Sequence, residues 1–158
     1  MTKPLQLPAL DPATVSQVES TGYPEPYRAS VAGRKRRRLG DAAGLTQFGV
    51  NEAELAPGTW SSQRHWHAAE DEFVYVLDGE LVLITDAGEQ VLTPGMAAGF
   101  PKGKRDGHHL VNRSEKPARY LEIGTRAAED RVEYPDIDMI CVGGGRERRY
   151  LKRDSSSF

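Results

Sequence analysis

The chain has 158 residues, a formal net charge of −2 at pH 7, 38% apolar residues and 28% charged residues. This composition is typical of a single folded domain with its own core, and the slightly acidic total does not favour nucleic acid as a partner. The single cysteine, Cys141, excludes an intrachain disulfide and is compatible with a reducing compartment. We find no apolar leader sequence and no run of roughly eighteen apolar residues, so we expect a cytoplasmic protein without a membrane span.

Residues 1–27 contain five prolines and little periodicity, which predicts an extended arm on the surface or on a neighbouring subunit. Asp11 before Pro12 is typical of an N-cap followed by the first residue of a short helical turn. Residues 28–38 then carry six cations and no acid. Such a cluster can bind nucleic acid or anionic groups. Because no recognition helix is evident, we interpret it as a solvated strand or a salt-bridge partner at a subunit contact, and the role of residues 34–38 stays open.

Residues 44–56 indicate one strand or two, with Leu45, Phe48 and Val50 as core candidates. After them, short runs of β-branched and aromatic residues alternate with turn signals. The turn signals are Asp78-Gly79, Asp86-Ala87-Gly88 and Pro94-Gly95. Short strands joined by glycine-containing turns every 8–12 residues or so predict an antiparallel sandwich or barrel.

The histidines fall into two pairs. His65 and His67 are one residue apart, so on a strand both side chains leave the same face. Glu72 follows at the head of the strand pattern EFVYVL, and His108 and His109 come about forty residues later. Three imidazoles and one carboxylate form a donor set that suits Zn²⁺, Fe²⁺, Mn²⁺, Ni²⁺ or Cu²⁺ and leaves positions for water or substrate. Ordinary packing and hydrogen bonding is the alternative for each histidine.

At this point two motifs resemble those of the cupin superfamily. The first is Gly58-x6-His65-x-His67-x4-Glu72-x6-Gly79, and the second is Gly95-x5-Pro101-x-Gly103-x4-His108-x3-Asn112. The spacing is longer than the family pattern by one residue before the first histidine and by two before the last, and both insertions fall in predicted loops. The resemblance extends over about residues 44–125. It implies an all-β double-stranded β-helix, a jelly-roll barrel with N- and C-terminal extensions.

The resemblance also implies one divalent metal ion, with zinc, iron, manganese and nickel as candidates. Its ligands, carried over by motif, are His65, His67, Glu72 and His108. His109 competes for the last place, and the spacing to Asn112 favours His108.

Glu70 and Asp71 are the alternatives to Glu72, but their place in a loop is more typical of solvated turn charges. If Glu72 points into the barrel, strand alternation turns Val74 and Val76 inward and Phe73 and Tyr75 outward. Only a second layer or a partner subunit can cover side chains on that outer face. We prefer a packing role to a role in the site for Tyr75, and likewise for Trp66.

Lys102, Lys104 and Arg105 precede the second histidine pair in a polar loop. They either attract an anionic substrate to the barrel mouth or are plain solvated charges. Further along, Ile137 to Val142 is a strand candidate that would pair with an edge strand, and Cys141 is expected to be a small buried apolar residue. The glycines at 143–145 indicate a flexible joint or a close backbone approach, and the Walker lysine spacing is absent.

These patterns divide the chain into an arm at 1–27, one cupin barrel domain at 28–143 and a basic, polar tail at 144–158. The resemblance implies a homodimer, and covering exposed sheet edges is a physical reason for it. The favoured function is a metal-binding cupin that acts on a small polar molecule, in the manner of a sugar or sugar-phosphate isomerase. The alternatives are an iron-dependent dioxygenase and a non-catalytic cupin that binds a small ligand or regulates. Whether the chain is an enzyme stays open, because one fold supports many chemistries.

Overall fold

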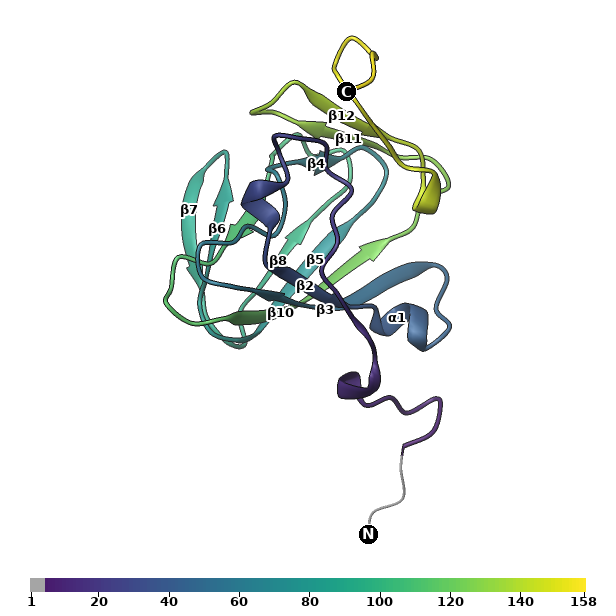
Figure 1. Cartoon of the computed structure of the whole chain (residues 1–158), viewed down its shortest axis with the longest axis vertical. Coiled ribbons are helices and arrows are strands. Elements are labelled where there is room, and N and C mark those ends of the chain that lie inside the picture. Colours follow the sequence, from purple (N-terminus) through teal and green to yellow (C-terminus); the bar gives the residue numbers. More distant parts are fainter. Residues whose placement is uncertain (1–4) are drawn as a thin grey trace.

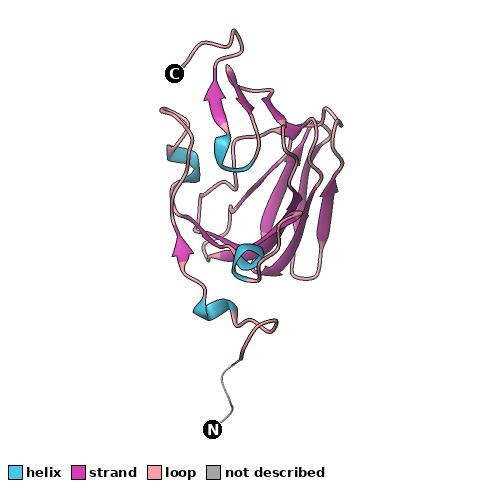
Figure 2. Cartoon of the chain, turned by 90° about the vertical axis from the view of Figure 1, so that its right-hand side faces the viewer, coloured by secondary structure: helices cyan, strands magenta, loops and turns pink. Residues whose placement is uncertain are grey.

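The structure, a computed structural model, describes residues 5–158, so the first four residues of the predicted arm lie outside the described residues. Antiparallel strands form three sheets that enclose a barrel (Figures 1 and 2). The all-β class predicted from the turn spacing is confirmed. Among residues 5–158, no helix combines the length and the apolar character that a membrane crossing would need.

The elements follow one another in chain order. They are η1 (Pro12–Thr14), β1 (Gln17–Val18), η2 (Ala29–Val31), β2 (Arg34–Arg37), α1 (Leu39–Ala42), β3 (Phe48–Leu55), β4 (Trp66–His67), β5 (Glu72–Asp78), β6 (Leu81–Thr85), β7 (Gly88–Leu92), β8 (Ala97–Phe100), β9 (His109–Val111), β10 (Ala118–Thr125), β11 (Arg131–Tyr134), β12 (Met139–Val142), η3 (Gly145–Glu147) and β13 (Arg149–Leu151).

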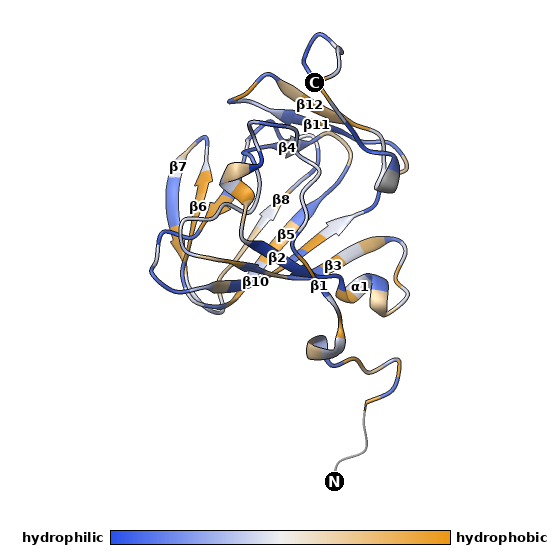
Figure 3. Ribbon diagram, in the orientation of Figure 1, coloured by the Kyte–Doolittle hydropathy of each residue, from blue (hydrophilic) through white to orange (hydrophobic). Residues whose placement is uncertain are grey.

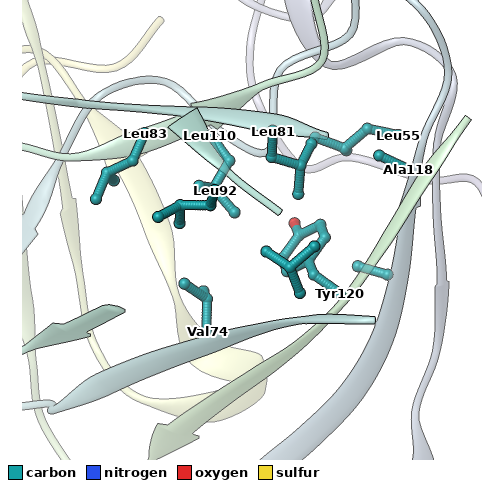
Figure 4. Packing of buried hydrophobic residues seen from close by; sticks show 10 residues of the cluster. Leu55, Val74, Leu81, Leu83, Leu92, Leu110, Ala118 and Tyr120 are labelled. Atoms are coloured by element: carbon teal, nitrogen blue, oxygen red, sulfur yellow. The ribbon is translucent and has the colours of Figure 1, made fainter. Parts of the chain in front are cut away.

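The main core lies between a six-stranded sheet, ordered β1-β2-β3-β10-β5-β8, and a three-stranded sheet, ordered β7-β6-β9. In the close-up of Figure 4, Leu83 and Leu110 of the smaller sheet lie opposite Val74 of the larger one. Tyr120 of β10 is 1% exposed and faces the same core, where it lies opposite Val76 of the neighbouring strand β5. Alternate residues of each strand thus supply the apolar interior, as the period of a strand requires.

The inward and outward alternation predicted for β5 is confirmed. Val74 and Val76 are buried, whereas Phe73 and Tyr75 are 42% and 39% exposed on the outer face of the six-stranded sheet. Turning from β5 into β6 requires Gly79, which has a φ of +78° and lies against β10. A Cβ atom there would come within 2.8 Å of Ala118.

The predicted core of the 44–56 segment is wrong. Leu45 precedes the strand and is 38% exposed, and Phe48 is 40% exposed at the start of β3. Val50 is only half-buried, since it lies across the sheet from Ile123 on the outer face. The residues of β3 that enter the core are Ala53 and Leu55. Phe48 and Val50 therefore lie on the outer face of β3, and Ala53 and Leu55 on the inner face.

A second apolar cluster joins the N-terminal segment to the four-stranded sheet, ordered β13-β12-β11-β4. It includes Tyr23, Tyr134 and Cys141, and the burial of this cysteine confirms its expected role. The predicted turn near residue 12 is also confirmed as η1, whose cap Asp11 accepts a hydrogen bond from Ala13 N at 2.9 Å. Residues 5–16 extend away from the barrel in Figure 1.

Residues 34–37 of the basic segment form strand β2, which stands out as hydrophilic in Figure 3. The strand is not solvated as interpreted from the sequence, because its cations are buried or half-buried and pair within the chain. Arg36 Nε lies 2.5 Å from Glu122 Oε1, and Arg37 Nη1 lies 3.1 Å from Glu52 Oε1. Arg34 is buried and donates to the carbonyl oxygen of Ser61. Much of this positive charge is therefore used to join β2 to the barrel, which leaves less of it to attract nucleic acid.

Candidate metal centre

All three sheets contribute to one cluster of titratable side chains. His65 and His67 lie at β4 in the four-stranded sheet, and Glu72 is the first residue of β5 in the six-stranded sheet. His108 immediately precedes β9 in the three-stranded sheet. Backbone hydrogen bonds of 3.2 and 2.9 Å pair His65 with His108, which places their imidazoles side by side.

The imidazoles converge on a single carboxylate oxygen. Glu72 Oε2 lies 3.3 Å from His65 Nε2, 3.4 Å from His67 Nε2 and 2.9 Å from His108 Nε2. An ion held about 2.1 Å from each ligand would set neighbouring ligands roughly 3.0–3.4 Å apart, for right-angle to tetrahedral geometry. The distances to Glu72 Oε2 lie close to this range, and the donor types suit a first-row divalent cation. His65, His67 and Glu72 form a group whose ligand atoms all lie within 4.8 Å of one another, and His108 joins them at Glu72 Oε2.

The other ring nitrogens of two of these histidines have partners that orient the rings. His65 Nδ1 lies 2.9 Å from the carbonyl oxygen of Gln63, so it donates there and leaves Nε2 as the unprotonated nitrogen. His67 Nδ1 lies 2.5 Å from Asp130 Oδ2. Such contacts are the usual way in which a protein presents Nε2 to a metal.

The ring of His108 is held differently, by stacking on Phe100 with 3.6 Å between ring centroids and 1° between the planes. Its Nδ1 is buried and has no hydrogen-bond partner within the described residues. The ring is thus fixed by packing on one face and by Glu72 at Nε2.

The electrostatics of the cluster also suit cation binding. Burial lowers the pKa of His65, which keeps this ring neutral. Burial opposes ionisation of Glu72, but the surrounding imidazoles hold its pKa well below the usual range, so it is a carboxylate at neutral pH. For His67 burial again opposes the charged form, but the hydrogen bonds to Asp130 and Glu72 outweigh it and raise the pKa to about 9. A cation that binds Nε2 of His67 must displace that proton.

His109 faces away from Glu72. Its Nδ1 lies 3.0 Å from the carbonyl oxygen of Ser62, and its ring packs edge-to-face on Trp60 with 4.7 Å between centroids. The sequence left His108 and His109 in competition, and the geometry brings His108 to the carboxylate. Its role as a ligand stays a prediction.

A cavity of about 270 Å³ opens above the cluster. Its lining residues are Trp66, His67, Glu70, Glu72, Leu83, Thr85, Ala87, Gln90, Ala98, Gly99, Phe100, Pro101, Lys104, Asp106 and His108. Trp66 thus borders the site, where a packing role was preferred, whereas Tyr75 lies outside it. Of the three loop cations considered, Lys104 is the one that lines the cavity, and its Nζ lies 3.6 Å from Asp106 Oδ2.

The interpretation of Glu70 as a solvated turn charge is wrong. Glu70 is 7% exposed, accepts a hydrogen bond from Ala127 N at 3.0 Å and forms an ion pair with Arg148. Asp71 does behave as a loop charge, because it is exposed and accepts from Lys102 N at 2.8 Å. The turn composition of the segment AAED carries no signal that separates these two acids.

Sequence reasoning also missed Asp130. It lies more than sixty residues from His67 and reaches it only because β11 pairs with β4, with Val132 opposite His67. No motif spacing encodes that register. An acid just before a strand pattern is a signal that could have nominated it, though many acids share that position.

Comparison with known proteins identifies the family. A family model described as Cupin domain matches residues 51–124. A crystal structure from Silicibacter pomeroyi, described as a sugar phosphate isomerase from a cupin superfamily, is 42% identical, with a TM-score of 0.92 and 96% of each chain covered. A second structure, from Acidithiobacillus ferrooxidans and provisionally named a sugar phosphate isomerase, is 30% identical, with a TM-score of 0.71 and coverage of 79% of this chain and 80% of that one.

Among curated proteins, the tetracenomycin polyketide synthase protein TcmJ of Streptomyces glaucescens is 33% identical over 100 residues. That match covers 63% of this chain, and the chain spans 65% of the length of TcmJ, just under two thirds.

Proposed function

The chain belongs to the cupin superfamily, and we propose that it is a metal-dependent, isomerase-like enzyme that acts on a sugar or sugar phosphate. The observation that carries the proposal is the meeting of three imidazole nitrogens within 3.4 Å of one carboxylate oxygen beside a cavity. Ligand-like geometry alone is common to many cupin chemistries, so the cavity and the relatives supply the rest of the argument.

The residues that would hold the ion are His65, His67, Glu72 and His108. When bound, a divalent cation supplies a Lewis acid that polarises a carbonyl or hydroxyl oxygen. Zinc, iron, manganese and nickel all suit three imidazoles and a carboxylate. The described residues offer no thiolate here that would restrict the choice to softer metals.

The cavity supports a small, polar substrate. Its volume of about 270 Å³ lies near the lower limit of ligand pockets, which favours a single sugar over a polycyclic aromatic molecule. Thr85 and Gln90 offer groups that can hydrogen bond to hydroxyls, and Lys104 offers a cation for a phosphate. The rings of Trp66 and Phe100 provide apolar walls against which the C–H face of a sugar can pack.

Glu72 is the group we propose for proton transfer. It is ionised, and one oxygen, Oε2, is engaged by the imidazoles. Aldose–ketose isomerisation requires a base that removes a proton from the carbon next to the carbonyl and returns it to the neighbouring carbon. The second oxygen of Glu72 can hold that proton.

Two solved relatives support a sugar phosphate as the substrate. The Silicibacter pomeroyi structure is 42% identical over almost the whole chain and is described as a sugar phosphate isomerase. TcmJ, from a polyketide synthase system, is 33% identical over a shorter stretch. A polyketide is therefore the alternative substrate class, but the small cavity argues against it.

The test begins with metal content, measured by mass spectrometry on protein as purified and by calorimetric titration of Zn²⁺, Mn²⁺ and Ni²⁺. Aldose and ketose phosphates are then incubated in D₂O with and without oxygen, and products are followed by ¹H NMR. We expect about one metal per chain and isomerisation that is independent of oxygen and stops on chelation. Oxygen-dependent turnover would favour the dioxygenase alternative. Thermal stabilisation by sugars without turnover would favour a binding cupin, and failure to bind any of the metals would refute the metal centre.

We also propose a homodimer formed through the outer face of the six-stranded sheet. Directly opposed residues of neighbouring strands form an apolar patch there: Val50, Phe73, Tyr75, Leu121 and Ile123. A row of alternating charges borders it: Lys35, Glu54, Arg119 and Asp78. An alternating row can meet opposite charges on a second copy related by a two-fold axis, which favours this same chain as the occupant.

A further inference from the structure

Two buried carboxylates lie behind His67, on the side away from Glu72. Asp130 Oδ2 is 2.5 Å and Glu70 Oε2 is 3.7 Å from the same atom, His67 Nδ1. Both acids are less than 10% exposed. Two anions that close to each other in a buried site repel, and each loses hydration, so such a pair persists only with a compensating cation.

Arg148 supplies that cation from the C-terminal segment. Its Nη2 forms an ion pair with Glu70 Oε2 and lies 3.8 Å from Asp130 Oδ2. The remaining oxygens of the two acids accept backbone hydrogen bonds, from Ala127 N to Glu70 and from Ala69 N to Asp130. The guanidinium therefore completes a network that fixes both acids relative to His67.

The glycines after β12 explain how Arg148 reaches this position. Gly143 has a φ of +97°, and its N–H donates to the carbonyl oxygen of Asp130 at 3.1 Å. A Cβ atom on Gly144 would overlap the carbonyl oxygens of Ala127 and Ala128. Of the two sequence interpretations, the close backbone approach is thus the one that applies at Gly144.

From this geometry we infer that Arg148 is a positioning residue, which orients His67 toward the metal centre by compensating Glu70 and Asp130. The inference rests on the proposed function, because it requires that His67 bind a metal. On this inference, the segment after residue 143 contributes to the function of the metal centre through Arg148. Arg148 also takes the place that a cation would occupy among His67, Glu70 and Asp130, a group whose ligand atoms lie within 4.8 Å of one another.

The possible roles of Arg148 predict different changes in metal affinity when its side chain is removed. If it acted only as a nearby positive charge, its removal would strengthen cation binding at the centre. If it only stabilised the fold, removal would lower the melting temperature and leave the metal affinity unchanged. A positioning residue predicts weaker binding, because without the guanidinium the two acids are no longer held in place, and the contact of Asp130 with Nδ1 that aims Nε2 of His67 at the centre is loosened.

The experiment titrates Zn²⁺ into metal-free wild type and the variant Arg148→Gln by calorimetry, with Arg149→Gln as the control. Arg149 is the next residue and is exposed. We expect the dissociation constant of Arg148→Gln to rise about 10- to 100-fold, the range typical of lost support to a ligand, and that of Arg149→Gln to stay within about twofold. NMR of the His67 ring should show a changed ring environment in Arg148→Gln and an unchanged one in Arg149→Gln.

The double variant Glu70→Gln/Arg148→Gln keeps the test decisive if Arg148→Gln folds poorly. It removes one buried anion together with the cation, so we expect it to fold and to recover most of the lost affinity. Unchanged or tighter Zn²⁺ binding by Arg148→Gln, or a double variant that binds more weakly than Arg148→Gln, would overturn the inference while leaving the metal centre intact. Failure of the wild type itself to bind metal would overturn both.

Discussion

His108 and His109 allow a matched test of the metal centre. They are adjacent and almost equally buried, at 6% and 5% exposure, but only His108 lies beside Glu72. Replacing either by alanine removes one buried ring of the same size. The loss of packing is therefore closely balanced between the variants, and any difference in metal affinity reports ligation.

The magnitudes follow from the contacts. Each alanine variant should lose about 2–4 kcal/mol of stability, the usual cost of truncating a large buried side chain. For a domain of this size that is a fall of about 5–15 °C in melting temperature. Structural four-ligand zinc sites bind with about 10–16 kcal/mol, which is roughly 3 kcal/mol per ligand. His108→Ala should therefore weaken Zn²⁺ binding on the order of 100-fold, whereas His109→Ala should change it little.

The assay is calorimetric titration of metal-free protein, with melting curves recorded on the same samples. If an alanine variant melts at too low a temperature for titration, the pair His108→Gln and His109→Gln is used instead, because glutamine retains more of the side-chain volume. The reasoning is refuted if both variants lose affinity equally, or if His108→Ala binds Zn²⁺ as the wild type does.

Three further predictions concern the barrel around the centre. Gly79→Ala should destabilise the fold by about 2 kcal/mol or more, because of its positive φ and its approach to Ala118; an unchanged denaturation midpoint would contradict this. Asp136, whose pKa is lowered mainly by its hydrogen bond to Arg64, contributes stability above its unfolded pKa near 3.9 that is lost as pH falls through the lower folded pKa. Asp136→Asn should therefore cost up to about 1 kcal/mol in urea denaturation at pH 7, after allowance for solvent screening, and almost nothing near pH 2; an equal cost at both pH values would count against the ion pair. Tyr75→Asp, on the outer face of the six-stranded sheet, should convert the dimer to a monomer in light scattering without loss of metal content. The control Val91→Asp, on the three-stranded sheet, should leave the dimer intact. A monomeric wild type would refute the dimer proposal.

The sequence suffices to group the side chains of the candidate centre, because most of the information that groups them is local. His65 and His67 sit one residue apart at a strand, and Glu72 heads the next strand, so alternation and motif spacing suffice to bring them together. His108 required the motif as well, since alternation alone could not choose between it and His109. The choice depends on which ring meets Glu72 and which meets Trp60.

The parts that sequence reasoning missed depend on pairing between distant segments. Asp130 reaches His67 through the register of β11, and Arg148 reaches Glu70 and Asp130 through the packing of the glycine segment. Neither feature has a local signature in the sequence. Glu70 looked like a turn charge because its partner lies 78 residues away. The error in β3 is of another kind: Phe48 is large and apolar but lies on the outer face of the sheet, and composition cannot tell a core face from a contact face.

His67 lies in β4, Glu72 in β5 and His108 directly before β9, three strands of three different sheets. An ion bound between these side chains would therefore cross-link the three sheets. Chelation should then loosen all three sheets together, and amide hydrogens of β5, β6 and β11 should exchange faster in step. The lifetime of such a protein would depend on the supply of its ion, because the metal-free form unfolds more often and is degraded faster by proteases.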